Sequence, residues 1–278
     1  MSSTRPLLRQ ALKWIWILFL IFVGFCFYLY LRQGDMIFLP QKTTDTRWDE
    51  IIQTEKVDYM SIRADDGAVL EGMLLHDFSE EPRPTVIFFG GNSMVVEQFV
   101  HHFLRLRSHG VNVLLMDYRG YGLSTGKPDA YWMKRDAEKI FDAANAHPYV
   151  DASQITAWGY SLGTGIAAHL AATKPIAKVI LYSSFTSMAD LAQEQYPFIP
   201  VRLLLKHNFE TLTLARTLTQ PVLIVQGEDD KQISPDHATK IADAWAGEAK
   251  LMIVPERGHN DLLEDERVWE RVIAFLLQ

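Results

Sequence analysis

The sequence predicts an α/β fold, a mostly parallel twisted sheet with helices on both faces, preceded by one N-terminal transmembrane helix. Two observations carry this prediction. From residue 85 onward, short apolar runs typical of buried strands alternate with helical stretches, which implies crossover connections between parallel strands. Ahead of them, residues 14–31 form an uncharged apolar run. The 278 residues, 48% of them hydrophobic, provide for a sizeable core in one large domain or two small ones.

The apolar run 14–31 is predicted to cross a membrane as a helix. It would be ~27 Å long, close to the roughly 30 Å hydrocarbon core of a bilayer. Aromatic residues typical of membrane interfaces stand at its two ends: Trp14, Trp16, Tyr28 and Tyr30. A cleaved signal peptide is the alternative, but the run is long and no small-residue cleavage site follows it. Lipid attachment at Cys26, the only cysteine, is disfavoured because bulky Phe25 precedes it.

Basic residues before this run predict its orientation: Arg5, Arg9 and Lys13. Because positive charge is retained in the cytoplasm, we expect a cytoplasmic N-terminus and a catalytic body in the periplasm or outside the cell. Residues 1–33 are then the tail and the anchor, and residues 34–278 form the folded domain.

The elements of the body follow from hydrophobic period and turn residues. Residues 36–40 and the polar stretch after them are expected to be a connector. Residues 56–62 and 68–75 alternate around Asp65-Asp66-Gly67, which predicts a hairpin. Apolar runs predict the further strands 85–89, 111–116, 154–158, 178–182, 222–226 and 251–254. Helices are expected between and after them at 95–108, 128–147, 162–173, 235–245 and 261–277, with Pro128 in a first turn.

The alternation breaks between residues 184 and 218. This segment is apolar and is expected to be partly helical. Two interpretations remain open, an ordinary connecting helix and a small lid.

The run Gly159-Tyr160-Ser161-Leu162-Gly163 matches G-x-S-x-G between a predicted strand and a predicted helix. In that setting the serine sits on a strained turn that exposes its hydroxyl as a nucleophile. Glycine is expected on either side because the turn leaves no room for a Cβ. Ser161 is therefore the candidate nucleophile.

A serine nucleophile needs a histidine base and a carboxylate that orients the base, each presented after a late strand. His259 follows the last predicted strand, and the acidic triplet 228–230 follows the strand before it. Spacing alone leaves the carboxylate open between Asp229 and Asp230. The other eight histidines lie outside the loop that this order requires.

Acyl transfer also needs N–H donors for the developing oxyanion. The N–H of Leu162, directly after the nucleophile, is one candidate. The second is the N–H of Asn92, in the Gly90-Gly91-Asn92-Ser93 loop after the first parallel strand, although this loop could equally be a plain tight turn.

With these residues in hand, the chain resembles the α/β-hydrolase superfamily. It is most similar to the membrane-anchored serine hydrolases of the bacterial periplasmic-type and the eukaryotic lipid- or thioester-cleaving branches. The matching pieces span nearly the whole body: 88–92, 117–124, 159–163, 221–235 and 258–261. The D-Y-R-G-Y-G-x-S string at 117–124 is the most family-specific piece, and the resemblance implies that it is a structural loop beside the active site.

The resemblance also implies that the catalytic acid is Asp230, three residues after Gly227. Two positions depart from the family pattern, because Gly90 and Gln226 stand where the family commonly has histidine. We therefore expect the oxyanion loop to be supported differently here.

The sequence thus predicts a serine hydrolase with Ser161, His259 and Asp230 as its triad, acting on an ester or thioester, with a lipid-like acyl group as one candidate. The alternatives are a serine peptidase or amidase and a catalytically silent binding module of the same fold. We expect no cofactor and no metal site. A nucleic-acid partner is disfavoured by the net charge of −7 and by the lack of a basic stripe. The acyl group, the leaving group and the oligomeric state are not indicated.

Overall fold

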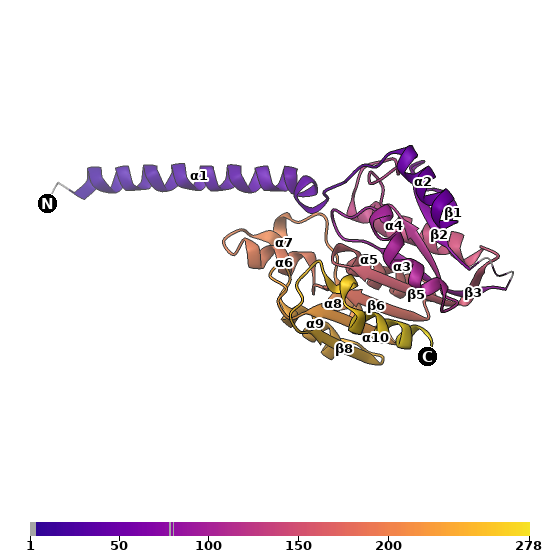
Figure 1. The fold of residues 1–278 in the computed structure, drawn as a ribbon. Coiled ribbons are helices and arrows are strands. Elements are labelled where there is room, and N and C mark those ends of the chain that lie inside the picture. The colour runs from indigo at the N-terminus through magenta and orange to yellow at the C-terminus, as the bar shows by residue number, and fades with distance from the viewer. Residues whose placement is uncertain (1–3, 78, 80) are drawn as a thin grey trace.

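Helix α1 (Thr4–Ile37) projects away from the rest of the chain, which forms a sheet flanked by helices (Figure 1). This computed structural model describes residues 4–77, 79 and 81–278. Residues Leu8–Ile37 of α1 are long and apolar enough to cross a membrane, and most of their side chains are exposed. The helix contains the predicted span 14–31 and continues past residue 33, where the anchor was expected to end.

The sheet has eight strands in the order β1-β2-β4-β3-β5-β6-β7-β8. They are β1 (Asp58–Arg63), β2 (Val69–Leu75), β3 (Arg83–Phe89), β4 (Asn112–Met116), β5 (Val150–Tyr160), β6 (Lys178–Tyr182), β7 (Val222–Gly227) and β8 (Ala249–Val254). β1 and β2 form the predicted hairpin, with Asp58 opposite Leu74, and β2 pairs antiparallel with β4. The pairings from β4 through β8 are parallel, so the predicted fold class is confirmed.

Helices cover both faces of the sheet. The further helices are α2 (Asp45–Glu55), α3 (Val100–Arg107), α4 (Ala130–Asn145), α5 (Leu162–Thr173), α6 (Met188–Gln195), α7 (Val201–Leu204), α8 (Thr211–Ala215), α9 (Pro235–Ala244) and α10 (Glu266–Leu276), with 3-10 turns at Val96–Gln98 and Leu262–Glu264. Ile87 of β3 lies in a core with α4, α5, α8 and α9, whereas Phe88 lies in a second core with α2, α3 and α10. Successive side chains therefore enter different cores, as a strand buried on both faces requires.

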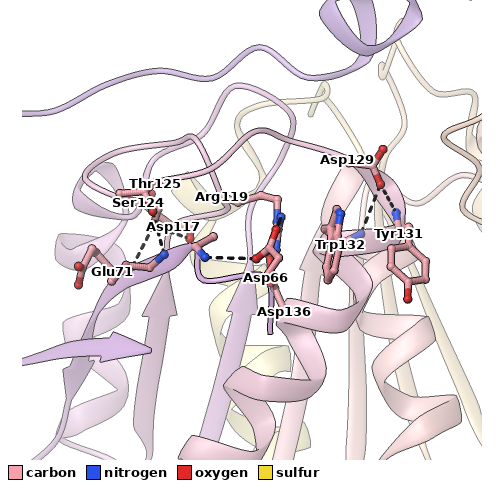
Figure 2. Close-up of polar contacts among 12 residues, drawn as sticks. Asp66, Glu71, Asp117, Arg119, Ser124, Thr125, Asp129, Tyr131, Trp132 and Asp136 are labelled. Carbon is pink, nitrogen blue, oxygen red and sulfur yellow. Dashed lines mark hydrogen bonds and ion pairs between the residues drawn. The ribbon is translucent and has the colours of Figure 1, made fainter. Parts of the chain in front are cut away.

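Two local expectations were wrong. The polar stretch after residue 40 contains helix α2, capped by the Thr44 side chain, with Trp48 and Ile51 buried. A single buried pair one turn apart is too weak a pattern to predict a helix from sequence. Pro128 lies outside α4, because Asp129 is the cap and its carboxylate accepts from the N–H groups of Tyr131 and Trp132 (Figure 2).

Residues 188–205, which contain α6 and α7, form a small lobe that we call the cap. It projects from the carboxyl ends of the strands on the side from which α1 extends (Figure 1). The predicted 184–218 insertion thus divides into this cap and α8, which packs on α5.

Candidate active site

Ser161 lies on the turn that joins β5 to α5, with φ 50° and ψ −114°. This left-handed backbone is strained for a side chain larger than glycine, as expected for a nucleophile elbow. Glycine is required on either side of Ser161 because a Cβ atom has no space there. A Cβ on Gly159 would lie 2.3 Å from the Gly163 carbonyl oxygen, and one on Gly163 would lie 2.0 Å from that of Phe89. Close backbone approach therefore fixes both positions as glycine.

His259 lies in the loop after β8 and faces Ser161. Its Nε2 is 3.1 Å from Ser161 Oγ. The hydroxyls of Tyr160 and Ser183 both donate to the His259 carbonyl, so the loop is held from the ends of β5 and β6. The histidine is thus placed by backbone contacts and its ring remains available to its neighbours.

Asp230 lies in the loop after β7 with its side chain fully buried. Its Oδ2 is 2.7 Å from His259 Nδ1, and its Oδ1 accepts from the N–H groups of Gln232 and Ile233. Burial by itself would raise the pKa of this carboxyl, but the hydrogen bonds from His259 and from the Ile233 N–H hold it below its usual value. Asp230 is therefore an ionised carboxylate aimed at the imidazole.

The surroundings of Asp230 distinguish it from the other two members of the acidic triplet. Glu228 and Asp229 are exposed, so Asp230 is the member of the triplet that contacts the histidine. The Gln226 side chain donates to Asp230 Oδ2 at 2.8 Å and to the Ile233 carbonyl. Gln226 thus supplies a neutral donor to the carboxylate at the position where the related family commonly has histidine.

The two candidate oxyanion donors lie beside Ser161. Leu162 and Asn92 line the same cavity as Ser161 and His259. Within residues 4–77, 79 and 81–278, neither N–H has a protein acceptor. An N–H group at a helix start carries partial positive charge, which suits Leu162 to a developing oxyanion. Both groups are therefore free to donate to a bound substrate.

Two tyrosines hold the loop that carries Asn92. Tyr118 donates to the Gly90 carbonyl at 2.7 Å, and Tyr121 donates to the Asn92 carbonyl at 2.6 Å. The Leu39 N–H reaches both the Tyr121 hydroxyl and the Asn92 carbonyl. The loop with Gly90 and Asn92 is thus supported by two hydroxyls of the 117–124 loop.

The 117–124 loop itself is a structural unit beside this site. Figure 2 shows the Arg119 guanidinium between Asp66, at the β1–β2 turn, and Asp136 of α4. The Ser124 hydroxyl donates to the Asp117 carbonyl and accepts from the Glu71 N–H. Arg119 does not line the cavity with Ser161, so its contacts are structural.

A cavity of about 250 Å³ contains Ser161 and His259 and is mostly apolar. The cap and Phe185, in the segment between β6 and the cap, supply one wall: Phe185, Met188, Leu191, Ala192, Gln195, Tyr196, Ile199, Val201, Leu204 and Leu205. The end of α1 supplies another: Leu29, Gln33, Met36 and Ile37.

Sequence reasoning missed the α1 wall. The one available signal was Gln33, an uncharged polar residue two positions after the apolar span 14–31. Among the described residues, no three His, Cys, Asp or Glu side chains are grouped so as to hold a metal ion.

Comparisons with known proteins agree with this architecture. A family model described as alpha/beta hydrolase fold matches residues 84–209. An uncharacterized protein of Mycobacterium tuberculosis is 27% identical over 271 residues, 97% of this chain and 96% of that protein. The alpha/beta hydrolase domain-containing protein WAV2 of Arabidopsis thaliana is 27% identical over 236 residues, 77% of each chain. The acetyl xylan esterase of Paenibacillus sp. R4 superimposes with a TM-score of 0.67 at 18% identity, over 88% of this chain and 98% of that one.

Proposed function

The chain belongs to the α/β-hydrolase superfamily, and from this premise we propose that it is a serine hydrolase that cleaves a carboxylic ester or thioester. The observation that carries the proposal is the run of contacts from Ser161 Oγ to His259 Nε2 at 3.1 Å and from His259 Nδ1 to Asp230 at 2.7 Å. An ordinary serine hydroxyl is a poor nucleophile, and this arrangement supplies the base that activates it and the carboxylate that orients the base.

The reaction then proceeds in two acyl transfers. Ser161 Oγ attacks the substrate carbonyl while His259 Nε2 takes its proton, and the N–H groups of Leu162 and Asn92 bind the oxyanion. The tetrahedral intermediate collapses, the carbon–oxygen or carbon–sulfur bond breaks, and His259 returns the proton to the leaving group. Water, deprotonated by His259, then attacks the acyl carbon, the bond from that carbon to Ser161 Oγ breaks, and His259 returns the proton to Oγ as the acid leaves. Asp230 stays ionised and stabilises the imidazolium.

Fluorophosphonate labelling of the full chain in detergent tests the nucleophile. We expect covalent labelling of the parent and of a Ser153→Ala control, whose serine lies on the exposed part of β5, and none of Ser161→Ala. Labelling that survives in Ser161→Ala would refute the assignment. An unlabelled but folded parent would instead favour a silent module of the same fold.

Substrate preference separates the remaining possibilities. We expect turnover of p-nitrophenyl esters of graded chain length and of acyl thioesters, and little or none of peptide p-nitroanilides. The apolar cavity beside Ser161 supports an acyl group over a peptide. Faster cleavage of the anilides would make the chain a peptidase or amidase.

The proposal places the site at a membrane. Helix α1 crosses the bilayer with its N-terminus in the cytoplasm and carries the catalytic body on the other face, since basic residues precede the apolar span. C-terminal fusions in a bacterial host test this orientation. We expect the alkaline phosphatase fusion to be active and the fluorescent-protein fusion to be non-fluorescent. An inactive phosphatase fusion together with a fluorescent second fusion would place the catalytic body in the cytoplasm.

A further inference from the structure

The end of α1 is built into the cavity that holds the candidate nucleophile. Leu29, Gln33 and Met36 line the same cavity as Ser161 and His259. Positions 29, 33 and 36 follow the spacing of one helix face, so a single stripe of α1 faces the site. A helix that only tethers a domain has no need of such a stripe.

Gln33 fastens this stripe to the cap. Its side chain is buried, its Nε2 donates to the Leu204 carbonyl at 3.0 Å, and its Oε1 accepts from the Lys206 N–H at 2.6 Å. The Lys206 ammonium also lies 3.6 Å from the centre of the Tyr30 ring. Both ends of one amide are thus paired with backbone far away in sequence. The cavity wall is therefore one unit made of anchor and cap.

The outer face of the cap carries two large apolar side chains in the open. Phe198 is 89% exposed and Leu203 is 85% exposed, whereas their neighbours Ile199 and Leu204 line the cavity. The cap lies on the side from which α1 extends (Figure 1). Large exposed apolar groups of this kind mark a surface that binds something apolar.

The hydrogen bonds of Gln33 fix the height along the α1 axis at which the cap contacts this helix. Tyr28 and Tyr30 end the apolar span, where aromatic residues mark the membrane interface. Gln33 lies three residues beyond Tyr30, a rise of only about 4.5 Å along the helix. Because the Leu204 carbonyl accepts a hydrogen bond from Gln33, the cap contacts α1 near the height of the membrane interface. Leu203 directly precedes Leu204 in the chain, so it lies near this height.

From these observations we propose that the cavity opens onto the bilayer and takes the acyl chain of a membrane-resident ester or thioester, with α1 as one wall. The inference rests on the proposed function, because the acyl carbonyl is the group that Ser161 attacks. The acyl chain of the substrate enters along α1 beneath the cap. Phe198 and Leu203 insert into the lipid beside it and hold the mouth of the cavity at the membrane surface. Helix α1 is then part of the binding site as well as an anchor.

A cross-linking experiment tests the wall. The full chain in phosphatidylcholine nanodiscs is labelled with a long-chain alkyl fluorophosphonate that carries a terminal diazirine, and is then irradiated. We expect cross-linked peptides from residues 29–37 and from the cap. Cross-links confined to other elements would overturn the proposal. Failure of the probe to label Ser161 at all would instead count against the proposed function.

A kinetic comparison tests the mouth. The ratio of kcat/KM for a long-chain p-nitrophenyl ester in phosphatidylcholine vesicles to that for soluble p-nitrophenyl acetate is measured for each variant. We expect Phe198→Ser/Leu203→Ser to lower this ratio at least tenfold. The matched control is Leu277→Ser, 56% exposed and near the C-terminus, away from α1 (Figure 1).

Each result of this comparison decides the proposal. An unchanged ratio in the double variant, or an equal fall in Leu277→Ser, would overturn it. A parent that prefers the soluble ester would also overturn it. An unchanged rate of fluorophosphonate labelling in every variant shows that the folded site is intact.

Discussion

At the scale of single residues, burial distinguishes the one of three neighbouring carboxylates that contacts His259. Glu228 and Asp229 point to solvent, where a carboxylate is a solvated turn residue. The Asp230 side chain is fully buried and accepts hydrogen bonds from His259, Gln226 and two backbone N–H groups. A buried charge is tolerated when its acceptors are satisfied in this way.

The two aspartates make a matched pair for mutagenesis. We expect Asp230→Asn to lower kcat on a soluble ester by on the order of 10³- to 10⁴-fold, because an amide favours the wrong histidine tautomer. Asp229→Asn should change kcat less than about twofold, since exposed charge is screened by water. Steady-state kinetics on p-nitrophenyl acetate give both numbers. A large loss in Asp229→Asn alone would reassign the acid.

Asp117 is a buried carboxyl outside the proposed chemistry. Burial raises its pKa to about 7, the nearby Glu97 adds to the rise, and the Val96 N–H bond and Lys42 oppose it. Because the folded state favours the protonated form, it holds a proton that the unfolded chain releases near pH 4. This group's contribution to stability is therefore complete below about pH 4 and is lost as the pH rises to about 7, on the order of 4 kcal/mol in all.

Asp117→Asn should remove that pH dependence. The amide oxygen can still accept from the Val96 N–H, as Asp117 Oδ1 does at 2.9 Å. We expect the apparent Tm of the parent in detergent, followed by tryptophan fluorescence, to fall between pH 5 and 8 more steeply than that of the variant. Parallel curves would show that Asp117 titrates normally.

At the scale of elements, predictions succeeded where a hydrophobic pattern is bounded by residues that begin or end an element. Helix α5 and strand β6 have the predicted bounds, because a glycine elbow opens the first and a buried apolar run defines the second. The loops after β7 and β8 follow from strand order alone, so the candidate nucleophile and base could be named from the residues, whereas the choice of Asp230 over Asp229 came from the family resemblance. The α1 wall could not, since it depends on contacts between Gln33 and residues more than 170 positions away.

The loop that carries Asn92 offers a test of how one element positions another. Tyr121→Phe removes the hydroxyl that donates to the Asn92 carbonyl and leaves the ring in place. If the Asn92 N–H serves the oxyanion, kcat should fall about tenfold, less than the 10²- to 10³-fold cost of losing a donor outright. KM should change little. Tyr59→Phe, which removes an exposed hydroxyl on β1, is the control. Equal kinetics in the two variants would show that the loop needs no such support.

At the scale of the whole molecule, one buried arginine joins three segments that are distant in sequence. Arg119 follows β4, and its guanidinium binds Asp136 of α4 through two hydrogen bonds of 2.6 and 2.7 Å and Asp66 of the hairpin turn at 2.8 Å (Figure 2). Its side chain is only 2% exposed. Burial raises the pKa of Asp136, against the lowering effect of Arg119. The arginine therefore supplies the opposite charge beside a desolvated carboxyl group and ties the antiparallel hairpin to the parallel part of the fold.

Removing Arg119 should cost far more than removing a neighbouring surface arginine. Arg119→Met leaves Asp136 buried without its partner, a penalty of about 3–5 kcal/mol, and should lower Tm by roughly 10 °C. Arg135→Met, one residue from Asp136 on the same helix and 44% exposed, should leave Tm unchanged. Arg119→Met/Asp136→Leu should recover most of the loss, because the unpaired charge is gone. If the double variant unfolds as early as the single one, Arg119 stabilises the fold by packing over Trp132 and not by pairing.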